Sequence, residues 1–102
     1  MRKSIEHNGQ EIGCLEYTIA ADELQITGLF VRPEYRRRGL AEAALRELLA
    51  ARPGLNNAYL EVRTDNQAAL GLYQKLGFIK TGIRKNYYRN PAGDAALLKR
   101  QI

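Results

Sequence analysis

Three consecutive arginines, Arg36, Arg37 and Arg38, run directly into Gly39 at the start of a segment with helical periodicity. The first backbone N–H groups of a helix lack partners and the helix dipole places positive charge there, so further cations are locally unfavourable. A bound pyrophosphate would resolve this conflict, because it accepts hydrogen bonds from backbone N–H and guanidinium groups alike. Gly39 and the small Ala41 would let the backbone approach such a ligand. A solvated charged face is the alternative, but the strand-to-helix turn around the arginines favours an anion site.

The whole chain, residues 1–102, is predicted to be a single domain with one core. Apolar residues make up 45% and charged residues 26%, as in ordinary globular proteins rather than disordered ones. The net charge of +5 suits a polyanionic partner, which could be nucleic acid, an acidic membrane surface or a phosphorylated cofactor. Charge alone does not choose among these.

A structural metal or a disulfide framework is not expected, because the chain holds one cysteine, Cys14, and one histidine, His7. Cys14 is interpreted as a buried strand residue and His7 as an exposed strand or turn residue. No apolar run approaches the roughly 20 residues of a membrane span, and the first ten residues lack the apolar core of a signal peptide. We therefore expect a cytoplasmic protein without a membrane partner.

The elements that must position the arginines follow from periodicity and turn residues. Strands are predicted at residues 2–7 and 11–20 around an Asn8-Gly9 turn, at 24–31 before Pro33, at 58–64, at 78–88 and at 94–102, the last two joined by a turn at 90–94. Gly28 is a candidate for a bulge within the third strand. A helix is predicted from Leu40, with its stop in the proline and glycine of residues 52–57. A second helix spans residues 67–77, between a cap at 65–66 and Gly77.

A strand, a helix and a strand in succession predict a parallel pair with a right-handed crossover. The remaining strands follow one another closely enough to pair antiparallel. The fold class is therefore α/β, with a mixed sheet that carries two helices.

Residues 36–41, Arg-Arg-Arg-Gly-Leu-Ala, fit the acetyl-CoA motif of the GNAT superfamily of N-acetyltransferases: Arg or Gln, two residues, Gly, one residue, then Gly or Ala. Upstream "LFVRPEY" and downstream "N.AAL.LY.KLGF" extend the match over nearly all of residues 24–102. "LEVRTDNQAALGLYQKLGF" followed by "GIRKNYY" is similar to the RimI class, bacterial enzymes that acetylate the N-terminal alanine of a ribosomal protein.

The resemblance implies a GNAT (acyl-CoA N-acyltransferase) fold with a mixed, mostly antiparallel sheet in an N-terminally shortened form. Full-length members begin with another strand and two helices that help form the acceptor groove. We therefore expect the cofactor half to be present and the acceptor half to be absent or supplied by a second subunit. Apolar surface left uncovered in this way predicts a homodimer.

By the same resemblance, Glu61 is the general base and Tyr73 the general acid. The acetyl and pantetheine arm of acetyl-CoA would lie along Leu29, Phe30 and Val31. Its pyrophosphate would be surrounded by Arg36, Arg37, Arg38, Gly39, Leu40, Ala41 and Glu42. Asn66 would also contact this co-substrate, and no metal is implied.

The chemistry of these residues agrees with such roles. Glu61 alternates with Leu60 and Val62 on its strand, so its carboxylate could reach a substrate amine directly or through a water. The phenol of Tyr73 could protonate a departing thiolate, and a backbone N–H at Val31 or its neighbours could stabilise an oxyanion. A solvated strand glutamate and a core tyrosine are the alternatives for the two side chains.

The leading hypothesis is an acetyl-CoA-dependent N-acetyltransferase for a primary amine, most simply the N-terminal α-amino group of a protein or peptide, such as a ribosomal protein. Alternatives are a non-catalytic coenzyme A or nucleic-acid binding module, and an acetyltransferase for a small amine or aminoacyl-tRNA. Tyr87 and Tyr88, beside the basic residues Arg84, Lys85 and Arg89, could stack on bases or line an acceptor groove. An ordinary amphipathic strand is the simpler account, so nucleic acid is not the expected partner.

Overall fold

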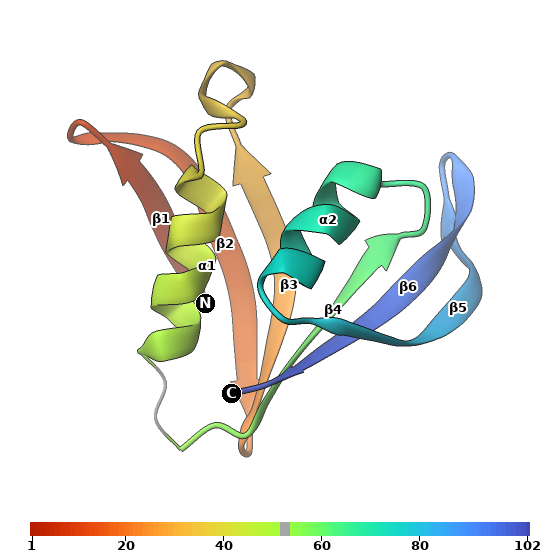
Figure 1. Ribbon diagram of the computed structural model, residues 1–102. Coiled ribbons are helices and arrows are strands. Elements are labelled where there is room, and N and C mark those ends of the chain that lie inside the picture. The colour runs from red at the N-terminus through yellow and green to blue at the C-terminus, as the bar shows by residue number, and fades with distance from the viewer. Residues whose placement is uncertain (52–53) are drawn as a thin grey trace.

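The computed structural model describes residues 1–51 and 54–102. In chain order the elements are β1 (Arg2–His7), β2 (Gln10–Ala20), β3 (Glu23–Val31), the 3-10 turn η1 (Pro33–Tyr35), α1 (Leu40–Ala50), β4 (Asn57–Arg63), α2 (Gln67–Lys75), β5 (Ile79–Arg89) and β6 (Ala92–Gln101). The strands form one sheet in the order β1-β2-β3-β4-β6-β5 (Figure 1). Among the described strands only β3 and β4 pair in parallel, and α1 connects them in the sequence, which confirms the predicted mixed sheet.

Both helices pack on the same face of the sheet. Cross-strand pairs place Lys3, Leu15 and Leu29 on one face, and Lys3 forms an ion pair of 3.0 Å with Glu47 on α1. On the same face, Tyr17 of β2 pairs with Ile26 of β3, Ile26 with Leu60 of β4, and Leu60 with Leu98 of β6. The buried residues of α1 are those that the helical stripe predicts: Ala44, Leu45, Leu48 and Leu49. We call this face the helix-bearing face and the other one the open face.

Local turn chemistry accounts for most element ends. Asn8 and Gly9 both have positive φ, of 53° and 77°, as a two-residue hairpin turn requires. Asn66 caps α2 by accepting a hydrogen bond from the Ala69 N–H at 3.1 Å, and Gly77 follows that helix with φ 91°. The predicted stop of α1 falls partly on residues 52 and 53, which lie outside the described residues; Gly54 has φ 90°.

The third strand ends at Val31, as predicted, and is followed by a 3-10 turn that begins at Pro33. Three expectations about local structure were wrong in detail. The last turn is shorter than predicted, because β6 begins at Ala92 directly after the Asn90-Pro91 pair. Cys14 is only half-buried, since Ser4 and Phe30 flank it on the open face, which no helix covers. His7 is half-buried rather than exposed, because its ring contacts the ring of Tyr35 at a centroid distance of 5.9 Å.

Within residues 1–51 and 54–102, no helix is long and apolar enough to cross a membrane.

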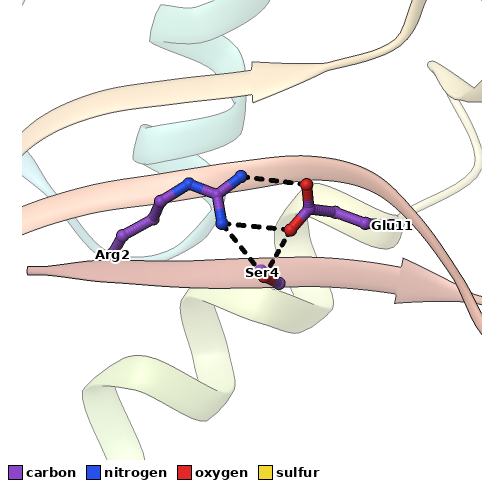
Figure 2. Close-up of polar contacts among 3 residues, drawn as sticks. All are labelled: Arg2, Ser4 and Glu11. Carbon is purple, nitrogen blue, oxygen red and sulfur yellow. Dashed lines mark hydrogen bonds and ion pairs between the residues drawn. The ribbon is translucent and has the colours of Figure 1, made fainter.

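Arg2, Ser4 and Glu11 join β1 to β2 through a closed polar cluster (Figure 2). The Arg2 guanidinium donates to both carboxylate oxygens of Glu11 at 3.0 Å, and the Ser4 hydroxyl donates to one of them at 2.5 Å. These hydrogen bonds, that from Arg2 above all, lower the pKa of the Glu11 carboxyl to about 2. The ionised carboxylate therefore links side chains of β1 and β2 at the outer edge of the sheet.

We predict that Glu11→Gln lowers stability at neutral pH and that this effect disappears in acid. Because the folded pKa lies below the ordinary value of 4.5, the carboxylate stabilises the fold above that value and loses its contribution as the pH falls towards 2. Urea unfolding of both proteins between about pH 7 and pH 2 measures the difference. Glu6→Gln on the same hairpin is the control, and a difference that stays constant over this range contradicts the prediction.

Gly13 allows β2 and β3 to approach closely beside the candidate site. A Cβ atom at this position would collide with the Phe30 carbonyl oxygen and lie 3.0 Å from the Val31 Cα, and both of these are backbone atoms. The strand that carries Val31 therefore depends on a glycine in its neighbour.

Gly13→Ala is expected to destabilise the protein by about 1–3 kcal/mol, because backbone atoms cannot move aside as a flexible side chain can. Gly71→Ala is the matched control: Gly71 lies within α2 with open space around it, so alanine there should stabilise by roughly 0.5–1 kcal/mol. Thermal and urea unfolding measure both changes, and a neutral Gly13→Ala would show that the two strands can separate without cost.

Candidate active site

The parallel strands β3 and β4 pair only over their first halves and then part. The last paired residues are Ile26 and Leu60, although β3 continues to Val31 and β4 to Arg63. A cleft of about 240 Å³ opens where they separate. It is lined by Ile26, Thr27, Gly28 and Leu29 of β3, Leu60, Glu61, Val62 and Arg63 of β4, Asn66, Ala69 and Tyr73 of the α2 segment, and Tyr88 of β5.

Glu61 and Tyr73 reach this cleft from opposite faces of the sheet. Leu60 and Val62 are buried on the helix-bearing face, so Glu61 between them lies on the open face, where its side chain keeps 24% of its exposure. Tyr73 lies on α2 and is only 6% exposed. The structure thus brings the predicted acid and base to one cleft, which strand alternation alone would keep apart.

The environment of Tyr73 keeps its phenol protonated. Burial raises the pKa of the phenol above its ordinary value of 10.0, and its ring packs edge-on against Phe78 at a centroid distance of 5.7 Å. The residue is therefore both a core tyrosine and a cleft-lining one, and its hydroxyl can donate a proton there.

The edge of β3 that faces the cleft carries backbone donors. The Arg32 N–H donates to the Ile12 carbonyl of β2 at 2.8 Å, so Val31 presents its own N–H and C=O to the opposite edge. The Val31 carbonyl accepts a hydrogen bond from Arg36 Nε there at 2.8 Å. By the same alternation the Leu29 N–H faces the edge from which β4 has parted.

A bulge in β3 marks the beginning of this edge. Glu16 and Tyr17 of β2 are neighbours, yet they pair with Gly28 and Ile26. Thr27 is therefore the extra residue of β3, next to the predicted bulge position. The nearest atoms to a Cβ built at Gly28 would belong to the Glu16 side chain, at 3.6 Å or more.

The start of α1 leaves its first N–H groups without side-chain caps. Its N-cap is Gly39, which has φ 75° and provides no capping side chain, and the first helical hydrogen bond runs from the Ala43 N–H to the Gly39 carbonyl at 3.0 Å. The preceding N–H groups, those of Leu40, Ala41 and Glu42, are free of helical partners. Glycine suits position 39 because of the positive φ and not because of crowding, since a Cβ atom there would meet nothing within 4 Å.

The three arginines take different roles in the structure. Arg36 folds back to the Val31 carbonyl, and the Arg38 guanidinium lies over the Tyr35 ring at 5.2 Å. Arg37 adopts the left-handed conformation with φ 64°, which is uncommon for a residue with a side chain. Within the described part of the chain, its side chain has no hydrogen bond or ion pair, which leaves it available to a ligand at the helix start.

Glu42 links the start of α1 to α2, and Asn66 caps α2 at the cleft. The Glu42 carboxylate forms ion pairs with Lys75 at 2.9 Å and Arg46 at 3.2 Å, and the hydrogen bond from Lys75 is the main cause of its lowered pKa. Asn66 uses its carbonyl oxygen as the α2 cap and lines the cleft, so its amide N–H₂ remains as a donor.

Phe30 lies apart from these residues, 52% exposed on the open face. Tyr88, which the sequence offered as a residue that could line an acceptor groove, lines the cleft. The lining residues that were not predicted as site residues are Ile26, Thr27, Gly28, Leu60, Val62, Arg63 and Ala69. Alternation along the strand of Glu61 could have indicated Arg63, whereas the place of Tyr88 at the cleft depends on long-range pairing. In residues 1–51 and 54–102 no group of three metal-ligating side chains occurs.

Comparison with known proteins decides the family. A profile described as "Acetyltransferase (GNAT) family" matches residues 3–78. The chain belongs to the GNAT acetyltransferase family. Its six-stranded mixed sheet with two helices is the GNAT fold, as the motifs predicted.

The chain is 47% identical over 79 residues to the N-alpha-acetyltransferase RimI of Mycobacterium tuberculosis, a match that covers 76% of this chain and 49% of that protein. The crystal structure of the ribosomal-protein-S18-alanine N-acetyltransferase from Escherichia coli superposes with a TM-score of 0.92 at 32% identity, over 100% of this chain and 68% of that one. Arabidopsis thaliana Naa50 in complex with the bisubstrate analogue CoA-Ac-MVNAL gives a TM-score of 0.84 at 27% identity, over 94% and 69%. This GNAT chain thus spans about half the length of the mycobacterial relative.

Proposed function

We propose that this chain is an acetyl-CoA-dependent N-acetyltransferase whose acceptor is a primary amine, in the first place the N-terminal α-amino group of a protein or peptide. The observation that carries the proposal is the cleft between β3 and β4, which Glu61 and Tyr73 both line, together with the uncapped start of α1 in the segment that follows β3. Similarity to N-terminal acetyltransferases, one of them in complex with a CoA-peptide analogue, supports the same chemistry.

In this proposal acetyl-CoA spans the turn and the cleft. The pyrophosphate is bound by the N–H groups of Leu40, Ala41 and Glu42 and by the guanidinium of Arg37. Its negatively charged oxygens accept hydrogen bonds from donors that the fold leaves unpaired. The pantetheine arm runs beside the exposed edge of β3. The N–H groups at Leu29 and Val31 are the donors available to the thioester carbonyl and to the oxyanion that forms from it.

The acceptor amine then attacks the thioester carbon from the open face. Glu61 takes a proton from the amine nitrogen, directly or through one water, as the new C–N bond forms. Collapse of the tetrahedral intermediate breaks the C–S bond, and the Tyr73 hydroxyl donates its proton to the departing coenzyme A thiolate. The raised pKa of Tyr73 suits this role, since the phenol is protonated when the donor binds.

An α-amine acceptor matches a single half-buried carboxylate better than a lysine side chain does. At pH 7 the neutral form costs about 1.4 kcal/mol for an α-amine of pKa about 8, and about 4.6 kcal/mol for a lysine of pKa about 10.4. A ribosomal protein is the proposed natural acceptor, from the names of the relatives alone. The homodimer and the cytoplasmic location remain predictions.

The donor site predicts that Arg37→Gln weakens acetyl-CoA binding by roughly tenfold, because one charge-assisted hydrogen bond to the pyrophosphate is lost. Isothermal titration measures the dissociation constant, and the loss should shrink at high salt. Lys80→Gln removes the same charge from the exposed strand β5 and serves as the control. Equal affinities of wild type and Arg37→Gln would refute the assigned pyrophosphate site.

The catalytic roles predict that Glu61→Gln and Tyr73→Phe each lower kcat by about 10²–10⁴-fold while acetyl-CoA affinity changes little. Thiol release with a panel of peptides and small amines measures turnover, and titration measures donor binding. A binding module without catalysis would bind the donor and release no thiol with any acceptor. Unchanged turnover in both variants would refute the two roles, and RNA binding in place of donor binding would refute the enzyme proposal.

A further inference from the structure

The Glu61 carboxylate is contacted by an arginine from a strand that is not its neighbour. Arg84 lies on β5, and β6 stands between β5 and β4 in the sheet. The Arg84 guanidinium nevertheless reaches Glu61 Oε1, with an Nη1 to Oε1 distance of 3.3 Å. The ion pair engages one carboxylate oxygen, and Glu61 also lines the cleft.

Tyr87 completes a closed group of three side chains. A side-chain hydrogen bond with Glu61 is the main cause that raises the pKa of the Tyr87 phenol. The Arg84 guanidinium lies over the Tyr87 ring at 5.0 Å from its centroid. Arg84 therefore contacts both Glu61 and Tyr87, and these contacts limit the orientations open to the carboxylate.

An irregular stretch of β5 makes this group possible. Arg84 pairs with Ala95 and Tyr88 with Gly93, so three residues of β5 stand opposite Asp94 alone. Asn86 within the stretch has φ 55°, and its N–H donates to the Asp94 carboxylate at 2.9 Å. In a regular strand the residue three beyond Arg84 would point to the opposite face, and the bulge removes that alternation.

Stability does not explain the arrangement. The Arg84 side chain is 55% exposed, and ion pairs of this kind contribute little to folding. The hairpin of β5 and β6 is already held to β4 by Arg63, which donates to the carbonyls of Pro91 at 2.9 Å and Ala92 at 3.1 Å. Arg84 and Tyr87 are thus available to orient Glu61.

We propose that Arg84 and Tyr87 are positioning residues that fix the Glu61 carboxylate at the cleft, with one oxygen held and the other directed to the acceptor amine. This inference rests on the proposed function, because it assigns the two residues a role through Glu61. It concerns the acceptor step only, since the pyrophosphate site lies at the start of α1.

A double-mutant cycle with Glu61→Gln tests the inference. Arg84→Gln is expected to lower kcat about tenfold with the acetyl-CoA dissociation constant and the melting temperature unchanged, because a misplaced base costs rate rather than donor affinity. In the Glu61→Gln background the same substitution should change kcat less than twofold. Arg84→Lys, which keeps the charge, should recover part of the loss, and Lys80→Gln on the same strand should have no effect.

A tenfold loss that persists in the Glu61→Gln background would overturn the inference, as would full activity of Arg84→Gln. Tyr87→Phe gives an independent measurement, because it removes one hydroxyl from an exposed ring; its loss should be smaller, about threefold, and should also vanish in the Glu61→Gln background. If Glu61→Gln itself retains full turnover, the proposed function has failed in its choice of base, a result distinct from additive effects of Arg84.

Discussion

The structure depends on one interruption of hydrogen bonding, the point beyond Ile26 and Leu60 where the two parallel strands stop pairing. Backbone groups at a strand edge are strong donors and acceptors that must be satisfied by something. Here one carbonyl, that of Val31, is satisfied by Arg36, while the adjoining donors face a cleft. A ligand with a carbonyl and amide groups of its own can take the place of the missing strand.

The start of α1, like the edge of β3, has backbone N–H groups without partners that are available to a ligand. Arg37 and Gly39 both occupy left-handed conformations, and no side chain of the described residues caps α1. A non-glycine residue in this conformation costs free energy, which is tolerated where the surrounding structure or a ligand benefits. The ion pair of Glu42 with Lys75 meanwhile links the first turn of α1 to α2, the helix that lines the cleft.

The open face gives the two ends of the proposed reaction different surroundings. Tyr73 lies in the core, where burial keeps its phenol protonated. Glu61 lies on the opposite face among Arg84, Tyr87 and Tyr88, where an acceptor can approach. Because β3 and β4 part, the proposed acid Tyr73 and the proposed base Glu61 can line one cleft although they lie on opposite faces of the sheet.

Local sequence determined the element types, the caps at Asn66 and Gly77, the helical stripes and the arginine turn, because each depends on residues a few positions apart. The sequence also indicated the family, since the residues of the acetyl-CoA motif at 36–41 are contiguous. Only the tertiary structure decided where β3 and β4 part, that Arg36 returns to Val31, and that Arg84 crosses β6 to reach Glu61. These depend on strand register and on bulges at Thr27 and Asn86, and register is set by packing between distant segments that no local pattern records.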